Sequence, residues 1–273
     1  MGRIEKKKFW TAVFIVPPII LLIGLGPPLI LVLLVMCAIT IGLGEYYQLT
    51  LPDSKAIEKW IGIGIGIIFS LFMVYGDSEV KRILVVLVLL IISLLFMITS
   101  KDLSTTTTKI GIMFFGIFYI GFLLSHILMI NLIEDGKKWV LFLIITVWSG
   151  DVLALLFGSF WGRHKLYPKI SPNKTFEGLL GALIGPVISG TIYSWLLLPS
   201  LDRMKCIFLA IGIGLFGQLG DFTESMIKRS ANVKDSGSLI PGHGGMLDRV
   251  DSFLFSSPFL YFFILYIIKM KEN

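Results

Sequence analysis

One stretch of the chain joins an uncharged run to a dense group of charges. Residues 206–230 read CIFLAIGIGLFGQLGDFTESMIKRS and carry no charge up to residue 220. A run of about 20 predominantly apolar residues can cross the hydrocarbon core of a membrane, which is about 30 Å thick. The charges that follow belong in water or in a polar site. This stretch therefore predicts a membrane-spanning helix that ends at a polar site.

The composition of the whole chain agrees with a membrane protein. Of its 273 residues, 55% are apolar and 15% are charged, whereas a soluble domain usually carries roughly 25% charged residues. The mean hydropathy is +0.87. These values exclude a water-soluble globular protein. The net charge is +6, but Lys and Arg occur in short stretches between apolar runs, so we expect no nucleic-acid binding.

Nine apolar runs are candidate membrane spans. They cover residues 9–25, 28–48, 60–76, 83–99, 110–133, 139–158, 179–199, 206–222 and 252–268. Pro17-Pro18 and the lack of a small-residue cleavage site favour a retained first span over a cleaved signal. We expect an all-α, polytopic helical bundle that forms one integral membrane domain, residues 1–273. Residues 141–273 are expected to carry the site, and dimerisation is one interpretation of residues 1–140.

Lys and Arg are distributed unevenly between the two sides of these spans. Sixteen of the 24 fall in the N-terminal segment and in the alternate loops on its side, and eight fall on the other side. Because basic residues accumulate on the cytoplasmic side, we expect the N-terminus inside and the C-terminus outside. The loops 159–178 and 223–251 are then cytoplasmic. Both are longer than a connection requires, which favours a functional role.

Two carboxylates lie at positions where the membrane raises the free-energy cost of a charged group. Asp151 lies within VWSGDVLALLFG, and Asp221 ends GLFGQLGD. An ionisable group at membrane depth costs about 2.5–3.5 kcal/mol on insertion scales. Each acid either caps or snorkels at the end of a span, or faces a polar cavity that opens to the cytoplasm. A carboxylate that faces such a cavity would indicate a binding site.

The densest group of polar residues lies in residues 220–252. If the eighth span stays helical through Arg229, Asp221 and Ser225 share one face at i, i+4. Further candidates are two cations, Lys228 and Arg229; a charge pair, Lys234 and Asp235; a glycine-rich segment, His243, Gly244 and Gly245; and the acids Asp248 and Asp251 at the start of the last span.

Cations, carboxylates and a glycine-rich loop together suit the binding of a polyphosphate with a divalent cation. Mg²⁺ takes carboxylate and phosphate oxygens, Lys and Arg neutralise phosphate charge, and backbone N–H groups of glycines can hold an anion. No GxxxxGK[ST] motif occurs, and His243 has no Cys or His at ligand spacing, so neither a Walker A loop nor a zinc site is predicted. His243 is either a phosphate donor or a structural hydrogen-bonder. A loop that only marks topology would leave the acids unexplained.

The other long loop carries a basic strip at the expected membrane surface. Each cation there attracts anionic headgroups by roughly 1 kcal/mol. Ser171-Pro172 predicts a turn or a helix start, and Glu177, three residues beyond Lys174, is expected to hold that lysine. The alternative is an ordinary positive-inside loop. The basic strip consists of Arg163, Lys165, Lys169 and Lys174. The candidate substrate contacts here are Arg163, Lys165, Ser171, Lys174 and Glu177.

Several of these segments carry a family resemblance. SMIKR at residues 225–229, KDSG at 234–237 and HGGMLDRVD at 243–251 resemble the signature of the phosphatidate cytidylyltransferases, also called CDP-diacylglycerol synthases. SPNKTFEG at 171–178 and GQLGDFTES at 217–225 are similar to upstream blocks of the same family. The first 140 residues resemble the family only in being apolar and membrane-spanning.

The resemblance implies a reaction, a cofactor and a setting. CTP and phosphatidate would give CDP-diacylglycerol and pyrophosphate, with Mg²⁺ required. The protein would be an all-helical and commonly homodimeric enzyme of the bacterial cytoplasmic, or inner, membrane. The family's metal-associated acids correspond to Asp221, Asp248 and Asp251, and its phosphate-handling cations to Lys228, Arg229, Lys234 and Arg249.

The chemistry of the residues fits this reaction. A phosphate monoester has a second pKa of about 6 and is already anionic at pH 7, so no general base is strictly needed. Positioning and charge neutralisation must then supply most of the rate enhancement. We expect Mg²⁺ on Asp221 and Asp248, the leaving pyrophosphate at Lys228 and Arg229, and the lipid phosphate at Lys165 and Lys174.

Two other functions stay open on the residues alone. A CTP-dependent kinase of a polyprenol or lipid alcohol would need a general base, for which Asp151 or His243 could serve. Such a kinase would release CDP rather than pyrophosphate. A transporter or channel also buries Asp and uses broken helices, but it leaves the glycine-histidine loop and the paired acids unexplained.

Overall fold

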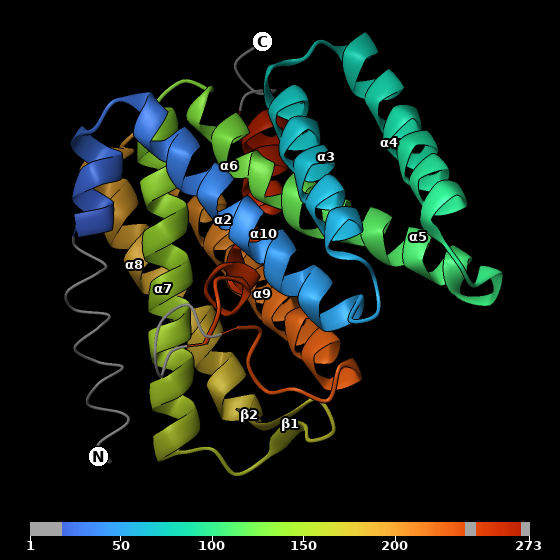
Figure 1. Cartoon of the computed structure of the whole chain (residues 1–273). Coiled ribbons are helices and arrows are strands. Elements are labelled where there is room, and N and C mark those ends of the chain that lie inside the picture. The colour runs from blue at the N-terminus through green and yellow to red at the C-terminus, as the bar shows by residue number, and fades with distance from the viewer. Residues whose placement is uncertain (1–17, 238–243, 269–273) are drawn as a thin grey trace.

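The computed structural model describes residues 18–237 and 244–268, and helices make up most of it (Figure 1). In these residues, eight helical segments are long and apolar enough to cross a membrane. The chain is therefore a multi-pass membrane protein with an all-α fold, as its sequence predicts. The first predicted span, 9–25, lies mostly outside the described residues, and its described part, 18–25, is helical.

The described spans follow one another with short connections in the first half. They are α2 (Pro28–Thr50), α3 (Ala56–Tyr75), α4 (Ser78–Thr99) and one composite span formed by η1 (Leu103–Thr105), α5 (Thr106–Gly116), the π-helical η2 (Ile117–Phe122) and α6 (Leu123–Asn131). The second half contains α7 (Gly136–Phe160), α8 (Phe176–Leu197), α9 (Arg203–Ser230) and α10 (Leu247–Phe263), which continues as the π-helical η3 (Ile264–Ile268). Each predicted span after the first corresponds to one described helical span, although several begin earlier than predicted and α9 ends eight residues later.

The helix α9 extends well beyond the predicted span 206–222. It stays helical to Ser230, so the conditional expectation of a helix through Arg229 is confirmed. Ser225 Oγ donates a hydrogen bond of 3.4 Å to Asp221 Oδ1 one turn away. The uncharged part of α9 can thus lie in the membrane while its last two turns carry a polar site.

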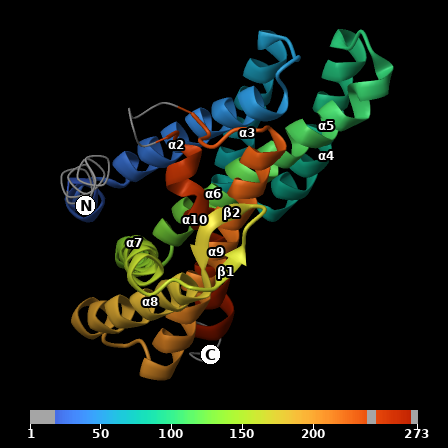
Figure 2. The same ribbon diagram turned by 90° about the horizontal axis from the view of Figure 1, so that it is seen from below.

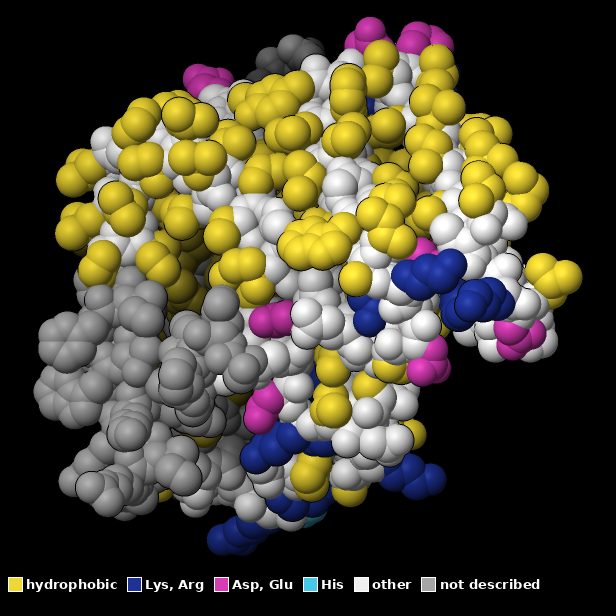
Figure 3. All heavy atoms as spheres, in the orientation of Figure 1, with side chains coloured by type: hydrophobic (Ala, Val, Ile, Leu, Met, Phe, Trp, Pro, Cys, Tyr) yellow, Lys and Arg dark blue, Asp and Glu magenta, His cyan; other side chains and the backbone are white. Residues whose placement is uncertain are grey.

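Large apolar side chains cover much of the outside of the bundle. On α4, for example, Val86, Leu90, Met97 and Ile98 are all exposed. Figure 3 shows apolar groups spread over the upper part of one face, with Lys and Arg gathered lower down. Such a surface is expected where lipid, rather than water, surrounds the helices.

Glycines let the helices of the second half approach closely. A Cβ atom on Gly181 of α8 would lie 2.3 Å from a carbonyl oxygen of α7, and one on Gly185 would lie 2.4 Å from the Ser149 carbonyl oxygen. A Cβ on Gly214 of α9 would lie 2.5 Å from a carbonyl oxygen of α8. Small residues at helix contacts permit this backbone approach in membranes, where apolar burial alone does not drive association. The packing fixes α7, α8 and α9 relative to one another.

A β-hairpin occupies the loop after α7, which the sequence analysis did not predict. The strand β1 (Lys165–Tyr167) pairs antiparallel with β2 (Ser171–Thr175). Ser171-Pro172 therefore begins a strand and not a turn or a helix; the proline is tolerated because β2 is paired along one edge only. The helix α8 begins next, where Thr175 Oγ1 accepts a hydrogen bond of 3.1 Å from the Gly178 N–H.

The hairpin and the C-terminal end of α9 lie at the same end of the bundle (Figure 1). Seen from that end, the hairpin lies beside α8 and α9, while α3, α4 and α5 extend to one side (Figure 2). Arg229 of α9 fastens the hairpin, since its Nε donates to the Ile170 carbonyl oxygen at 3.2 Å. The two long loops of the sequence therefore meet.

The close approach of α7 and α8 can be tested with one methyl group. Gly185→Ala is expected to lower the thermal unfolding midpoint in detergent, because overpacking a tight contact costs about 1–3 kcal/mol. The matched control is Gly64→Ala on α3, whose Cβ would meet nothing within 4 Å. The control should be neutral or stabilising by up to about 1 kcal/mol. Equal effects of the two substitutions would contradict the packing described.

Candidate functional site

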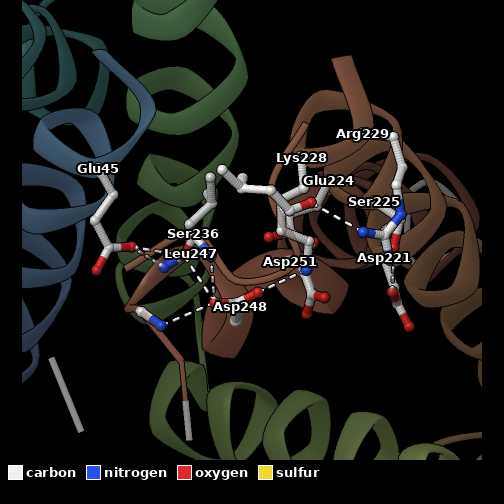
Figure 4. A network of polar contacts seen from close by, with 12 residues as sticks. Glu45, Asp221, Glu224, Ser225, Lys228, Arg229, Ser236, Leu247, Asp248 and Asp251 are labelled. Carbon is white, nitrogen blue, oxygen red and sulfur yellow. Dashed lines mark hydrogen bonds and ion pairs between the residues drawn. The ribbon is translucent and has the colours of Figure 1, made fainter. Parts of the chain in front are cut away.

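Three carboxylates converge at the polar end of α9. Asp221 and Glu224 lie on α9 and Asp251 on α10, and one oxygen from each lies within 4.8 Å of the others. Glu224 has no exposed surface, and its Oε1 has no hydrogen-bond partner among the described residues. We call these three residues the carboxylate trio; Figure 4 shows them close together.

Two lysines form ion pairs with the trio. Lys174 Nζ, from β2, lies 2.7 Å from Asp221 Oδ2. Lys228 Nζ lies 2.5 Å from Glu224 Oε2 and 2.6 Å from Asp248 Oδ1. Both lysine side chains are largely buried, at 19% and 12% exposure. The hairpin and the two last helices therefore each contribute charge to one site.

The trio has the chemistry of a site for a hard divalent cation. Like charges at this separation repel, and burial adds to the cost of keeping them ionised. All three groups offer carboxylate oxygen, the donor that Mg²⁺ takes in proteins. The buried Glu224 Oε1, which no hydrogen bond satisfies, is a free donor atom for such an ion. Asp221, Glu224 and Asp251 could therefore hold Mg²⁺.

Asp248 lies outside the trio, which differs from the expected ligand set of Asp221, Asp248 and Asp251. Its Oδ1 faces Lys228. Its Oδ2 accepts hydrogen bonds from Ser236 N at 2.9 Å, Ser236 Oγ at 2.8 Å and Gly245 N at 2.8 Å. Both oxygens of Asp248 thus accept from donors of this chain, and Asp248 is not among the three acids whose oxygens converge.

Glu224 was not among the predicted site residues, although its signal is present in the sequence. Glu224 lies three residues after Asp221 and four before Lys228, so on a helix it faces both. The buried acid Glu45 of α2 was also missed. Its carboxylate accepts hydrogen bonds from Ser236 Oγ, Met246 N and Leu247 N at 2.8–2.9 Å. A Glu within an apolar run is the same signal that drew attention to Asp151.

Glycines around this network serve two purposes. Gly244 has a φ of +78°, a left-handed conformation that favours glycine. A Cβ on Gly237 or Gly245 would lie 2.6 Å or 2.4 Å from a Glu45 oxygen. In the described part of the loop, these two glycines therefore make room for the Glu45 carboxylate.

Glu177 does not hold Lys174, which corrects the expectation from their spacing. The carboxylate of Glu177 accepts instead from His164, with 2.7 Å between Oε1 and Nδ1 and 3.3 Å to the His164 backbone N–H. The cause is the change from strand to helix between the two residues, since Thr175 ends β2 and α8 begins at Phe176. Lys174 is thereby left to pair with Asp221.

Asp151 and Tyr119 approach the site from other helices. Asp151 of α7 lines a small cavity with Gln218 of α9 and Ser252 of α10. Tyr119, on the π-helical η2, is 3% exposed, and its hydroxyl has no hydrogen-bond partner in the described residues. Its ring packs edge-on against Phe255 of α10, with 6.1 Å between the ring centroids. π-Helical turns often occur at functional sites.

Comparisons with known proteins identify the family. A model described as the cytidylyltransferase family matches residues 6–267 of the chain. The chain belongs to the cytidylyltransferase family. A Bacillus subtilis protein named phosphatidate cytidylyltransferase is 36% identical over 197 residues, which are 72% of this chain and 72% of that protein. Proteins of the same name from Staphylococcus haemolyticus and Staphylococcus aureus are 45% and 43% identical over 127 residues, which are 46% of this chain and 49% of each relative.

The remaining candidate residues of this cytidylyltransferase lie around the trio. Ser225 is buried against Asp221. Arg229 is exposed and bonded to carbonyl oxygens of Ile170 and Val233. Ser171 is half-buried opposite Tyr167 in the hairpin. Arg163, Lys165, Lys234, Asp235 and Arg249 are exposed. His243 lies outside the described residues. The described candidates thus form an inner group at α9 and α10 and an outer group of exposed charged residues.

The unpaired hydroxyl of Tyr119 generates a prediction. Tyr119→Phe should leave the unfolding midpoint unchanged or raise it, because an unpaired buried hydroxyl costs about 1–3 kcal/mol. It should lower cytidylyltransferase kcat/KM about tenfold, because we expect the free hydroxyl to donate to a phosphate of the bound substrates, and a hydrogen bond to a charged group contributes about 1.5–3 kcal/mol. Thermal unfolding and steady-state kinetics measure the two effects.

The control for Tyr119→Phe is Tyr47→Phe. The Tyr47 hydroxyl is buried and donates to the Met113 carbonyl oxygen at 3.1 Å. Its removal should lower stability by about 1 kcal/mol and spare activity, which is the opposite pattern. Unchanged activity in Tyr119→Phe would contradict a role of the Tyr119 hydroxyl in the reaction.

Proposed function

We propose that this chain is a phosphatidate cytidylyltransferase that transfers CMP from CTP to phosphatidate and releases pyrophosphate. The observation that carries the proposal is the carboxylate trio with Lys174 and Lys228 at the end of a membrane bundle. Membership of the family and the names of its relatives support it. A site at this position lies where a lipid phosphate and a water-soluble nucleotide can both reach it.

The reaction needs charge neutralisation more than proton transfer. An oxygen of the lipid phosphate attacks the α-phosphorus of CTP, the bond from that phosphorus to the oxygen bridging to the β-phosphate breaks, and pyrophosphate leaves. The attacking phosphate monoester already carries about −1.5 to −2 charge at pH 7. Bringing two polyanions together is the main barrier, which fixed cations and positioning lower.

The proposal assigns each charged group a task. Asp221, Glu224 and Asp251 hold Mg²⁺, which when bound supplies positive charge to the phosphates of CTP. Lys174 and Lys165 on the hairpin receive the lipid phosphate. The phosphates of CTP are bound by four other cations, Lys228, Arg229, Lys234 and Arg249. Asp248 keeps Lys228 in place through the 2.6 Å contact.

The proposal also places the protein in its membrane. The polar end of the bundle faces the cytoplasm of a bacterial inner membrane, because that side carries sixteen of the 24 Lys and Arg residues. The N-terminus is then inside and the C-terminus outside. We further propose that the chain forms a homodimer.

Product analysis tests the proposed function directly. Purified protein in detergent, supplied with labelled CTP, phosphatidate and Mg²⁺, should yield a lipid-extractable cytidine label and one pyrophosphate for each label. Chelation of Mg²⁺ should abolish both products. Release of CDP with a phosphorylated lipid alcohol would instead show a kinase. Solute flux without CTP consumption would show a transporter.

The lipid-side assignment of Lys174 yields a separate prediction. Lys174→Ala should raise the KM for phosphatidate about tenfold, the equivalent of one lost charge-assisted contact of about 1.5 kcal/mol, and should change the KM for CTP less. Lys169→Ala, an exposed cation of the same hairpin, is the control and should change neither constant. A larger rise in the KM for CTP would reassign the hairpin to the nucleotide.

A further inference from the structure

The first turn of α10 is capped by a residue from a distant helix. The first N–H groups of a helix have no partner within it and usually bond to a nearby side chain. Here Met246 N donates to Glu45 Oε1 and Leu247 N to Glu45 Oε2, both at 2.8 Å. Glu45 lies on α2, 201 residues before Met246 in the chain.

The same carboxylate holds the other flank of residues 238–243. Ser236 Oγ lies 2.9 Å from Glu45 Oε2 and 2.8 Å from Asp248 Oδ2, so its one proton can be donated to either acid. Ser236 is 5% exposed and Glu45 is 8% exposed. Glu45 therefore ties the chain before this stretch to the chain after it.

The backbone is shaped around Glu45. The three atoms nearest to a Cβ on Gly237 all belong to Glu45, with Oε1 at 2.6 Å and Cδ at 2.9 Å. A side chain at this position would therefore displace the carboxylate. Burying a carboxylate in a membrane protein is expensive, and an arrangement this closely fitted supplies three donors that offset the cost.

A continuous series of contacts leads from Glu45 to the carboxylate trio. Glu45 meets Ser236, Ser236 meets Asp248, and Asp248 meets Lys228, which pairs with Glu224 (Figure 4). Each member fixes the next through a charge-assisted contact. A shift of the α10 start would therefore move Asp248 and, through it, Lys228.

We infer that Glu45 is a positioning residue for the cytidylyltransferase site, through which the N-terminal half of the chain sets the position of Lys228. This inference rests on the proposed function for its effect on turnover. Glu45 touches no part of the trio itself, and it acts on the site by holding Ser236 and the first turn of α10. The helices before residue 140 are then part of the catalytic architecture.

The test compares Glu45→Gln with Glu58→Gln. Glu58 is a matched control because it is also buried, at 3% exposure, and caps a helix, accepting from Lys55 N at 3.0 Å. A glutamine at position 45 would keep one acceptor oxygen. Its NH₂ group would face one of the two backbone N–H groups that now donate to Glu45. Glu45→Gln should lower kcat about 10–100-fold, as loss of supporting contacts does, with KM for both substrates within about threefold. Glu58→Gln should leave kcat unchanged.

The coupling between substitutions at Glu45 and Gly237 distinguishes a positioning role of Glu45 from a merely structural one. Gly237→Ala should lower kcat in the wild-type background because its methyl group displaces Glu45. In the Glu45→Ala background the same substitution should change kcat by no more than about twofold, the range for sites that no longer interact. Equal fold losses in both backgrounds would overturn the inference.

Hydrogen exchange separates failure of this inference from failure of the proposed function. Amides of residues 244–251 should exchange faster in Glu45→Gln than in Glu58→Gln, whatever reaction the protein catalyses. Faster exchange together with wild-type protein that makes no CDP-diacylglycerol would reject the proposed function alone. Active wild-type protein with unchanged kcat in Glu45→Gln would reject the positioning role alone.

Discussion

The concentration of buried carboxylates where α9 meets α10 is the constraint on which the rest of the site depends. Asp221, Glu224 and Asp251 offer oxygens within 4.8 Å of one another, and such a group is unstable without nearby positive charge. Lys228 meets this need from one side, and Lys174 from the other. The hairpin folds over the end of α9 to deliver Lys174. In our proposal a divalent cation supplies the remaining charge.

The same electrostatic need links the two halves of the chain. Asp248 engages Lys228, and its other oxygen accepts from Ser236 and Gly245. Glu45 of α2 then holds both flanks of residues 238–243. A division into residues 1–140 and 141–273 describes where the signature motifs lie in the sequence. The contacts of Glu45 cross that division, so the N-terminal spans take part in shaping the site.

The spans and the inner candidates could be predicted because they depend on local sequence. Apolar length identifies a span, and spacing on one helix places Ser225 beneath Asp221. Partner choice could not be predicted in the same way. Glu177 pairs with His164, and Asp248 turns to Ser236, because a hairpin and the start of α10 fix which groups meet. The Glu45 contact joins residues about 200 positions apart, which no spacing rule can reveal.

Direct cation binding tests the central claim most sharply. Mn²⁺ is added to purified wild-type protein and to Glu224→Gln in detergent without CTP, and bound Mn²⁺ is measured by electron paramagnetic resonance. The account predicts that wild-type protein and the Glu58→Gln control bind Mn²⁺ equally and that Glu224→Gln binds it at least about tenfold more weakly. Equal affinity in wild-type protein and Glu224→Gln would contradict the account.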